Sequence, residues 1–183
     1  MENVFMDNVF AEPKSHSVFS WDNLGDIREG RGDLGELMPV LVYRLMQFTM
    51  VDVLTKEFGG EKANEILRSA GHLAGVEFAK NTLDLAAEFN VFLAQLQKTL
   101  QEYKIGILRM EQFDSANGDI TLTVGEDLDC SGLPISDETV CDYDEGFIAG
   151  ILDSFTGNKY QVREVDCWAN GDRVCRFKGS VVK

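Results

Sequence analysis

The sequence predicts an α+β domain in which N-terminal helices pack on an antiparallel sheet made of two hairpins, with a short helix inserted between the hairpins. Apolar residues recur at helical spacing up to Tyr103, and from Ile105 the period changes to the alternation of strands. A chain of 183 residues suits one core. We therefore expect an N-terminal arm, residues 1–33, and a single domain, residues 34–183, with a helical part, 34–103, and an α/β part, 104–183.

Three helices are expected in the helical part. Pro39 suits the first turn of one helix, and Gly59-Gly60 ends it. The second helix carries the small residues Ala70, Gly71, Ala74 and Gly75, which let another backbone approach closely and so predict a tight helix crossing. The third helix has a bulky apolar stripe formed by Leu85, Phe89, Phe92, Leu96, Leu100 and Tyr103.

Turn signals divide the α/β part into two hairpins. Asn117-Gly118 lies between two strands, the second of which places Ile120, Leu122 and Val124 on its inward face. A short helix follows, with Phe147, Ile148, Ile151 and Leu152 buried. Residues 160–167 and 173–181 then flank the turn Asn170-Gly171-Asp172, which predicts the second hairpin.

Charge and hydropathy exclude two classes of partner. The chain has 31 acidic and 17 basic residues and a formal charge of −14, so its surface would repel a phosphate backbone, and we expect no nucleic acid partner. The apolar run from Leu37 to Tyr43 is far shorter than the ~20 residues that span a bilayer, which predicts no membrane span. Residues 1–13 lack the features of a secretory signal, so we expect a cytoplasmic protein.

Four cysteines favour a metal site over a disulfide in such a compartment. A three-residue turn would place Cys167 opposite Cys175, and Glu164 shares the buried face of its strand with Tyr160 and Val162, where a cation would offset its charge. Because Glu164 and Cys167 are an odd number of residues apart, a strand irregularity is expected near Val165-Asp166. Spacing alone leaves three alternatives open: a Cys167–Cys175 disulfide, isolated buried thiols, or surface pairing of Glu164 with Arg163, Arg173 or Arg176.

One segment adds a family resemblance. It contains, in order, Ser131-Gly132-Leu133-Pro134, Cys141, Gly146, Gly150, Glu164-Val165-Asp166-Cys167, Gly171-Asp172 and Cys175-Arg176-Phe177. This segment resembles the V4R (4-vinyl reductase) domain family, which is related to the ligand-binding domains of phenol-sensing activators, to TRAPP-type subunits and to haem-NO sensors. The resemblance implies a structural Zn²⁺ held by Cys141, Glu164, Cys167 and Cys175, which leaves Cys130 out. It also implies a homodimer and an apolar pocket between helices and sheet.

These features predict a binding or sensory domain for a small hydrophobic or aromatic molecule, with any signalling output in a separate partner. The expected pocket residues are Phe89, Phe92, Leu96, Ile107, Leu122 and Phe147. Phenol sensors orient their ligand with a His and a Trp, and neither type occurs between Leu73 and Tyr160, which argues against phenol itself.

Two other functions stay open from the sequence. One is an accessory or reductase-like role on a tetrapyrrole or similar vinyl substrate, and the other is a TRAPP-like assembly subunit that binds an acyl chain. The chain has no Gly-x-Gly-x-x-Gly loop after a strand and no Ser-His-Asp set, so we expect no enzyme and assign no catalytic residue. A zinc ion with four protein ligands also has no open position for a substrate.

Overall fold

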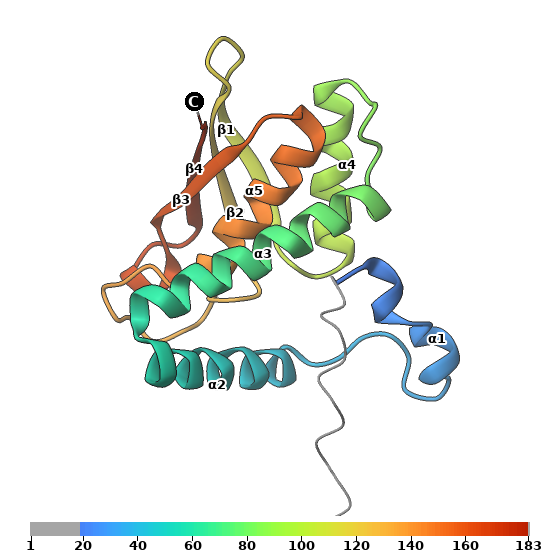
Figure 1. The fold of residues 1–183 in the computed structure, drawn as a ribbon, viewed down its shortest axis with the longest axis vertical. Helices are drawn as coiled ribbons and strands as arrows, with labels where there is room; N and C mark the ends of the chain where they lie inside the picture. Colours follow the sequence, from blue (N-terminus) through green and yellow to red (C-terminus); the bar gives the residue numbers. More distant parts are fainter. Residues whose placement is uncertain (1–18, 183) are drawn as a thin grey trace, which may run out of the picture.

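A computed structural model describes residues 19–182 (Figure 1). The helices are α1 (Ile27–Gly30), α2 (Val40–Phe58), α3 (Gly60–Thr82), α4 (Phe89–Glu102) and α5 (Asp142–Thr156), and two short 3-10 helices span Trp21–Leu24 and Trp168–Asn170. The strands are β1 (Ile107–Asp114), β2 (Asp119–Gly125), β3 (Tyr160–Asp166) and β4 (Cys175–Val181). The predicted fold class is confirmed: helices pack on a four-stranded antiparallel sheet.

The sheet joins the two predicted hairpins through their second strands, in the order β1-β2-β4-β3. The first hairpin turns at Gly118, whose φ of 78° suits glycine. Ile120, Leu122 and Val124 of β2 are buried as predicted. The predicted irregularity is also present, because the register between β3 and β4 shifts between Glu164 and Asp166. This shift lets Glu164 and Cys167 face the same side.

The tight helix crossing predicted for the second helix lies between α3 and α5, which pack side by side (Figure 1). Glycines from both helices meet there. A methyl group on Gly71 would overlap the carbonyl oxygen of Tyr143, and one on Gly75 would overlap that of Phe147. On α5, Gly146 lies equally close to the backbone of α3. The contact therefore depends on residues without a side chain.

Two details of the helical part differ from the prediction. The third helix begins at Phe89 rather than Leu85, because Asp84 accepts a hydrogen bond from the Ala86 amide and forms a local turn instead. Tyr103, expected on the buried stripe, ends the helix and is exposed. The predicted arm contains short helical turns, and Trp21 packs against the core while its amide donates to Glu77. Residues 1–18 of that arm lie outside the described residues.

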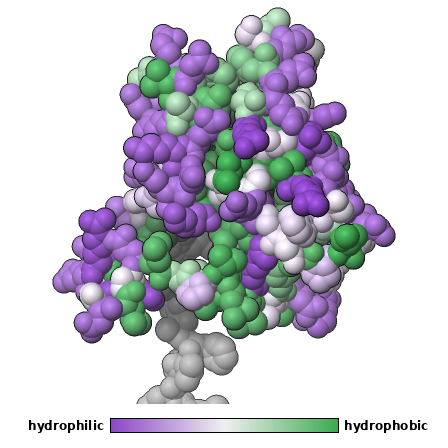
Figure 2. Space-filling view, turned by 180° about the vertical axis from the view of Figure 1, so that it is seen from behind, coloured by the Kyte–Doolittle hydropathy of each residue, from purple (hydrophilic) through white to green (hydrophobic). Residues whose placement is uncertain are grey.

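Helix α2 is poorly enclosed by the rest of the described fold. None of its residues is buried, and Leu41 and Leu45 are 76% and 65% exposed. It packs mainly against α3, and apolar side chains gather over it in the lower part of the face in Figure 2. None of the helices within residues 19–182 has the length and apolar character needed to cross a membrane.

Candidate metal centre and ligand cavity

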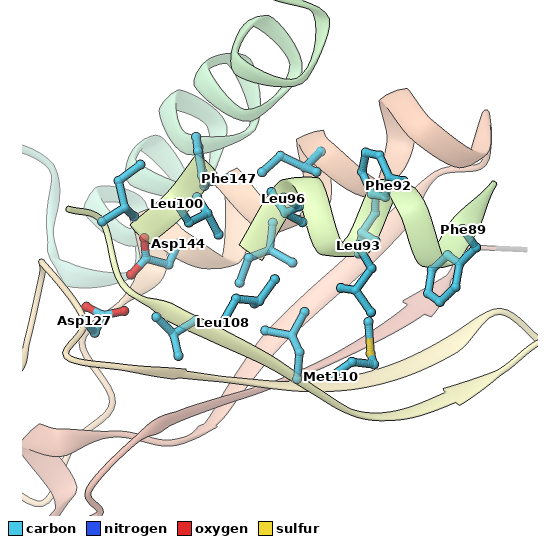
Figure 3. Close-up of a pocket in the computed structure, with 16 residues that line it drawn as sticks. Phe89, Phe92, Leu93, Leu96, Leu100, Leu108, Met110, Asp127, Asp144 and Phe147 are labelled. Atoms are coloured by element: carbon cyan, nitrogen blue, oxygen red, sulfur yellow. The ribbon is translucent and has the colours of Figure 1, made fainter. Parts of the chain in front are cut away.

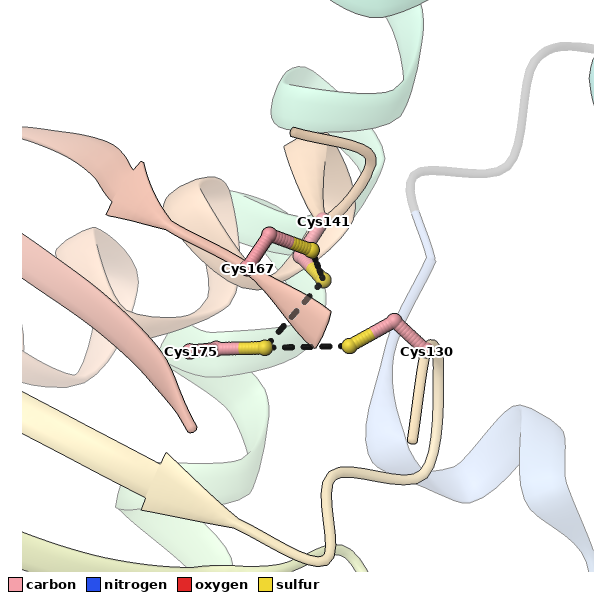
Figure 4. A group of neighbouring side chains, drawn as sticks. All are labelled: Cys130, Cys141, Cys167 and Cys175. Carbon is pink, nitrogen blue, oxygen red and sulfur yellow. Dashed lines mark hydrogen bonds between the residues drawn. The ribbon is translucent and has the colours of Figure 1, made fainter. Parts of the chain in front are cut away.

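Four buried cysteines meet at one end of the sheet (Figure 4). Cys130 lies in the loop after β2, Cys141 caps the start of α5, Cys167 follows β3 and Cys175 begins β4. All four sulfurs lie within 4.8 Å of one another, in a grouping that is compatible with a metal ion. The residues come from four separate segments, so an ion bound here would fasten the short helix and the loop to the second hairpin.

The distances fit one ion rather than a larger cluster. Zinc–sulfur bonds of about 2.3 Å place neighbouring sulfurs of a tetrahedral site about 3.8 Å apart. The sulfur of Cys141 lies 3.8 Å from that of Cys167 and 3.9 Å from that of Cys175. The sulfurs of Cys130 and Cys175 lie 3.0 Å apart, closer than this edge but far beyond the ~2.05 Å of a disulfide. Cys130 and Cys175 would have to separate by less than 1 Å to reach this distance.

Two local features position the cysteine sulfurs. The Cys167 amide donates to Oδ1 of Asn170 at 3.0 Å, and the Cys167 carbonyl accepts from the amides of Asn170 and Asp172. This compact loop brings Cys167 next to Cys175 across the hairpin. Cys141 lies at the N-terminus of α5, where the helix dipole stabilises a thiolate.

Glu164 lies beside the cysteines but outside the four-residue group. Its Oε2 accepts a hydrogen bond from the Cys141 amide at 3.0 Å, and its Oε1 is buried without a hydrogen-bond partner within the described residues. Burial raises the pKa of Glu164 to about 8. The structure thus brings together three of the predicted ligands, Cys141, Cys167 and Cys175, with Cys130 as the fourth sulfur and Glu164 adjacent.

The family resemblance left Cys130 out of the predicted ligands, and the sheet order that brings it close to Cys175 was not known from the chain. Val124 of β2 is the register partner of Cys175, so the loop that leaves β2 passes the start of β4. The signal that points to Cys130 is its place six positions after Val124 in an acidic loop. That position predicts proximity to Cys175 only when the pairing of β2 with β4 is known.

The alternatives to a metal site fit the structure poorly. All four cysteines are free thiols and all are buried. Arg163 pairs with Glu145, and Arg176 pairs with Glu111 and Asp166, so neither contacts Glu164. Hydrogen bonds among the sulfurs lower the pKa of the Cys167 thiol and raise those of Cys141 and Cys175.

An apolar cavity lies between α4, α5 and the first hairpin (Figure 3). Its volume is about 40 Å³. The residues that line it are Phe89, Phe92, Leu93, Leu96 and Leu100 of α4, Ile105, Leu108 and Met110 in and before β1, Leu122 and Val124 of β2, Asp127, and Asp144, Phe147, Ile148, Ile151 and Leu152 of α5. Two aspartates are thus the only charged side chains of the lining.

Five of the six residues expected to line a pocket do so, namely Phe89, Phe92, Leu96, Leu122 and Phe147. Ile107 does not, and Leu108 and Met110 line the cavity instead. Side chains alternate between the two faces along β1, so Leu108 and Met110 point toward the cavity and Ile107 points to the other face of the sheet. His72, which was given no role, lies outside the cavity and hydrogen-bonds Asp153 at 2.9 Å.

The two aspartates lie at one end of the cavity (Figure 3), where a carboxylate oxygen of each lies within 4.8 Å of the Cys141 sulfur. Asp127 accepts hydrogen bonds from the amides of Asp129 and Cys130, and burial together with the charge of Asp129 raises its pKa to about 7. Burial raises the pKa of Asp144 well above its ordinary value. The cavity and the cysteine group thus share one wall, formed by residues 127–130 and the start of α5.

Helix α2 holds this wall from outside. The Tyr43 hydroxyl donates to Asp129 at 2.8 Å, and the Arg44 guanidinium donates to the carbonyls of Leu128 and Ser131 at 2.8 and 3.0 Å. These contacts flank Cys130 on both sides. A displacement of α2 would therefore act on the loop that carries the fourth sulfur.

Comparison with known proteins agrees with this architecture. The uncharacterized protein MJ1642 of Methanocaldococcus jannaschii is 28% identical over 150 residues, 82% of each chain. The phenol-responsive sensory domain of the transcription activator PoxR, solved with phenol, has a TM-score of 0.64 at 16% identity over 80% of this chain and 76% of its own. A vinyl-4-reductase family protein from Methanocaldococcus jannaschii has a TM-score of 0.60 at 17% identity over 91% and 99%.

The family comparison concerns the segment that carries the cysteines. The sequence model of the V4R domain matches residues 120–181, which run from β2 to the end of β4 and include all four cysteines. The structural likenesses extend the same fold to the helical part. The predicted resemblance is therefore confirmed: residues 120–181 of this chain match the V4R domain.

Proposed function

We propose that the protein is a binding or sensory domain for a small, largely apolar molecule. The observation that carries this proposal is the cavity between α4, α5 and the first hairpin, which is apolar except at its one acidic end. Ligand sites combine such a lining with few polar groups that orient the ligand. The fold is shared with a sensory domain that responds to phenol, which supports the same class of function here.

The size of the cavity limits its occupant. About 40 Å³ is small beside the ~300–1,000 Å³ of common ligand sites. A ligand must therefore be small, or the cavity must open around it. Helix α4 is the wall that can move, because it packs mainly against β1, whereas α5 is held along its length by α3. Binding that shifts α4 would give a sensor its conformational change.

The test uses toluene as an apolar probe and isothermal titration calorimetry as the readout. Leu96→Phe adds volume inside the cavity, and Leu73→Phe makes the same change on the exposed side of α3. We expect the first variant to weaken toluene binding at least about tenfold and the second to leave it unchanged. Binding that is absent in the unaltered protein, or equal in both variants, would contradict a cavity site.

The metal centre is proposed to hold a structural zinc ion. Three ligands are Cys141, Cys167 and Cys175, and the sulfur distances favour Cys130 over Glu164 for the fourth position. Four protein ligands close the coordination sphere, so the ion supplies stability and no catalysis. In this arrangement Glu164 accepts from the Cys141 amide and orients that ligand from outside.

A homodimer formed through α2 is proposed as the working assembly. Helix α2 carries many apolar side chains, of a kind that is ordinarily buried, yet no residue of α2 is buried in the described chain. A second copy of α2 would cover Leu41 and Leu45 and remove this apolar surface from water. Because Tyr43 and Arg44 of the same helix hold the loop around Cys130, the dimer contact and the ligand site would be linked, and the signal would pass to a separate partner.

A further inference from the structure

One carboxylate oxygen at the acidic end of the cavity lacks a partner. Oδ2 of Asp144 is buried and has no hydrogen-bond partner among residues 19–182. A carboxylate oxygen of Asp144, one of Asp127 and the sulfur of Cys141 lie within 4.8 Å of one another. Figure 3 shows both aspartates at the same end of the cavity. A buried polar group without a partner is costly, so this end is suited to a molecule that brings a hydrogen-bond donor.

Nothing in the cavity wall supplies that donor. No Lys, Arg or His is among the described residues that line it. Asp127 is held in place as an acceptor by two backbone amides, and it cannot turn away from Asp144 without losing them. The remaining wall is aliphatic or aromatic. The lining residues among positions 19–182 therefore leave the N–H groups that this carboxylate oxygen could accept from to be supplied by a bound molecule.

A metal ion is a poorer candidate for this position than an organic cation. The sulfur of Cys141 belongs to the four-cysteine group, and without it only the two carboxylates remain. Divalent ions such as zinc take at least three ligands from a protein, and calcium takes six to eight oxygen ligands. An ammonium group needs only acceptors, and it carries three N–H donors.

We propose that the ligand of this cavity is a small amine, whose ammonium group is held by Asp144 and Asp127 and whose apolar body lies along α4. This inference rests on the proposed function of the cavity and names the class of molecule that it takes. An alcohol brings one donor and no charge, so it binds less tightly. A carboxylate of equal length brings no hydrogen-bond donor, and its charge has the same sign as that of an ionised aspartate.

Three six-carbon probes that differ only in their head group test this inference: n-hexylamine, n-hexanol and hexanoate. Titration calorimetry at constant ionic strength compares them on the unaltered protein, on Asp144→Asn and on Glu57→Gln. The last change removes the same charge from an exposed position on α2, and it controls for attraction of amines by the net charge of −14. Because Asp144 Oδ2 has no partner to lose, Asp144→Asn should fold, and Asp144→Ser serves as a second variant.

We expect hexylamine to bind at least about tenfold more tightly than hexanol, and hexanoate to bind weakest, since hydrogen bonds to charged groups are stronger than neutral ones. Asp144→Asn and Asp144→Ser should abolish the preference for the amine, while Glu57→Gln keeps it. Equal binding of all three probes, or an amine preference that survives both Asp144 variants, would overturn the inference and leave the cavity function standing. Failure of every probe, toluene included, would instead count against the cavity function itself.

Discussion

The sulfur of Cys130 lies 3.0 Å from the sulfur of Cys175, although 45 residues separate them in the chain. One strand pairing and one hydrogen bond of the loop after β2 create this proximity. Val124 at the end of β2 is opposite Cys175 at the start of β4, and the loop after β2 then returns over the same edge. The Leu128 amide donates to the Ile105 carbonyl, which fixes the path of that loop. The fourth sulfur is thus supplied by the first hairpin and the other three by segments beyond it.

The identity of the fourth ligand is decided by comparing Cys130→Ser with Glu164→Gln. We expect the first substitution to remove zinc from protein analysed by native mass spectrometry, and the second to keep one zinc with affinity reduced about tenfold, as for other groups that orient a ligand. In cobalt-substituted protein, the thiolate charge-transfer band should weaken in Cys130→Ser only. Retention of zinc by Cys130→Ser together with its loss from Glu164→Gln would reverse the assignment.

The glycine contact between α3 and α5 makes Gly75→Ala destabilising. Alanine is the better helix former by about 1 kcal/mol, but its methyl group would overlap the Phe147 carbonyl, and overpacking of a core costs about 1–3 kcal/mol or more. We expect a lower melting temperature by several degrees in calorimetry. Gly60→Ala, where a methyl group meets open space, is the matched control and should leave stability equal or higher. A melting temperature raised by Gly75→Ala would show that the helices can separate at no cost.

The pH dependence of stability should include a contribution from Asp153. Burial raises the pKa of Asp153, but hydrogen bonds from Lys159 and His72 outweigh it and hold that pKa below its ordinary value. A carboxylate with a lowered pKa in the folded state stabilises the protein above its unfolded pKa, near 4, and this contribution is lost as the pH falls through the folded value. Asp153→Asn should therefore lower the melting temperature at pH 7 and have progressively less effect below pH ~4.

The control for this experiment is Asp52→Asn, which breaks an exposed pair with Lys56 on α2. Exposed pairs contribute little, so this variant should match the unaltered protein at every pH. The Lys159 side chain is itself largely exposed, so most of the effect at Asp153 is expected from His72 and from the Tyr160 amide, which donates to Asp153 at 2.7 Å. An effect of Asp153→Asn that grows below pH 4 would contradict the assigned direction.

The exposed face of α2 predicts that Leu41→Glu with Leu45→Glu yields a monomer. Both side chains are among the most exposed apolar groups of the described chain, and two charges would make their burial against a second copy costly. Light scattering after gel filtration measures the mass. Thr55→Glu, an exposed polar position of the same helix, should remain dimeric. A monomer in the unaltered protein at micromolar concentration would remove the dimer from the proposal.

The sequence by itself determined the local elements and the resemblance to the V4R domain. The Asn117-Gly118 pair predicted the turn of the first hairpin. Periodicity predicted which side chains of β2 and α5 are buried, because side chains repeat every two residues in a strand and every 3.6 residues in a helix. The strand irregularity near Val165 also followed, since an odd spacing cannot place Glu164 and Cys167 on one face without it. Small residues on the second helix likewise anticipated the crossing with α5.

Only the tertiary structure decided which distant residues share a site. The pairing of β2 with β4 is a long-range choice that leaves no periodic signal in the chain, and it alone brings Cys130 to the sulfurs of Cys141, Cys167 and Cys175. The same holds for Asp127 and Asp144, which local patterns place in an ordinary acidic loop and on a helix. Both carboxylates line the same cavity, away from bulk water. A buried carboxylate oxygen needs a hydrogen-bond donor, so a molecule that binds in the cavity can supply one to both side chains.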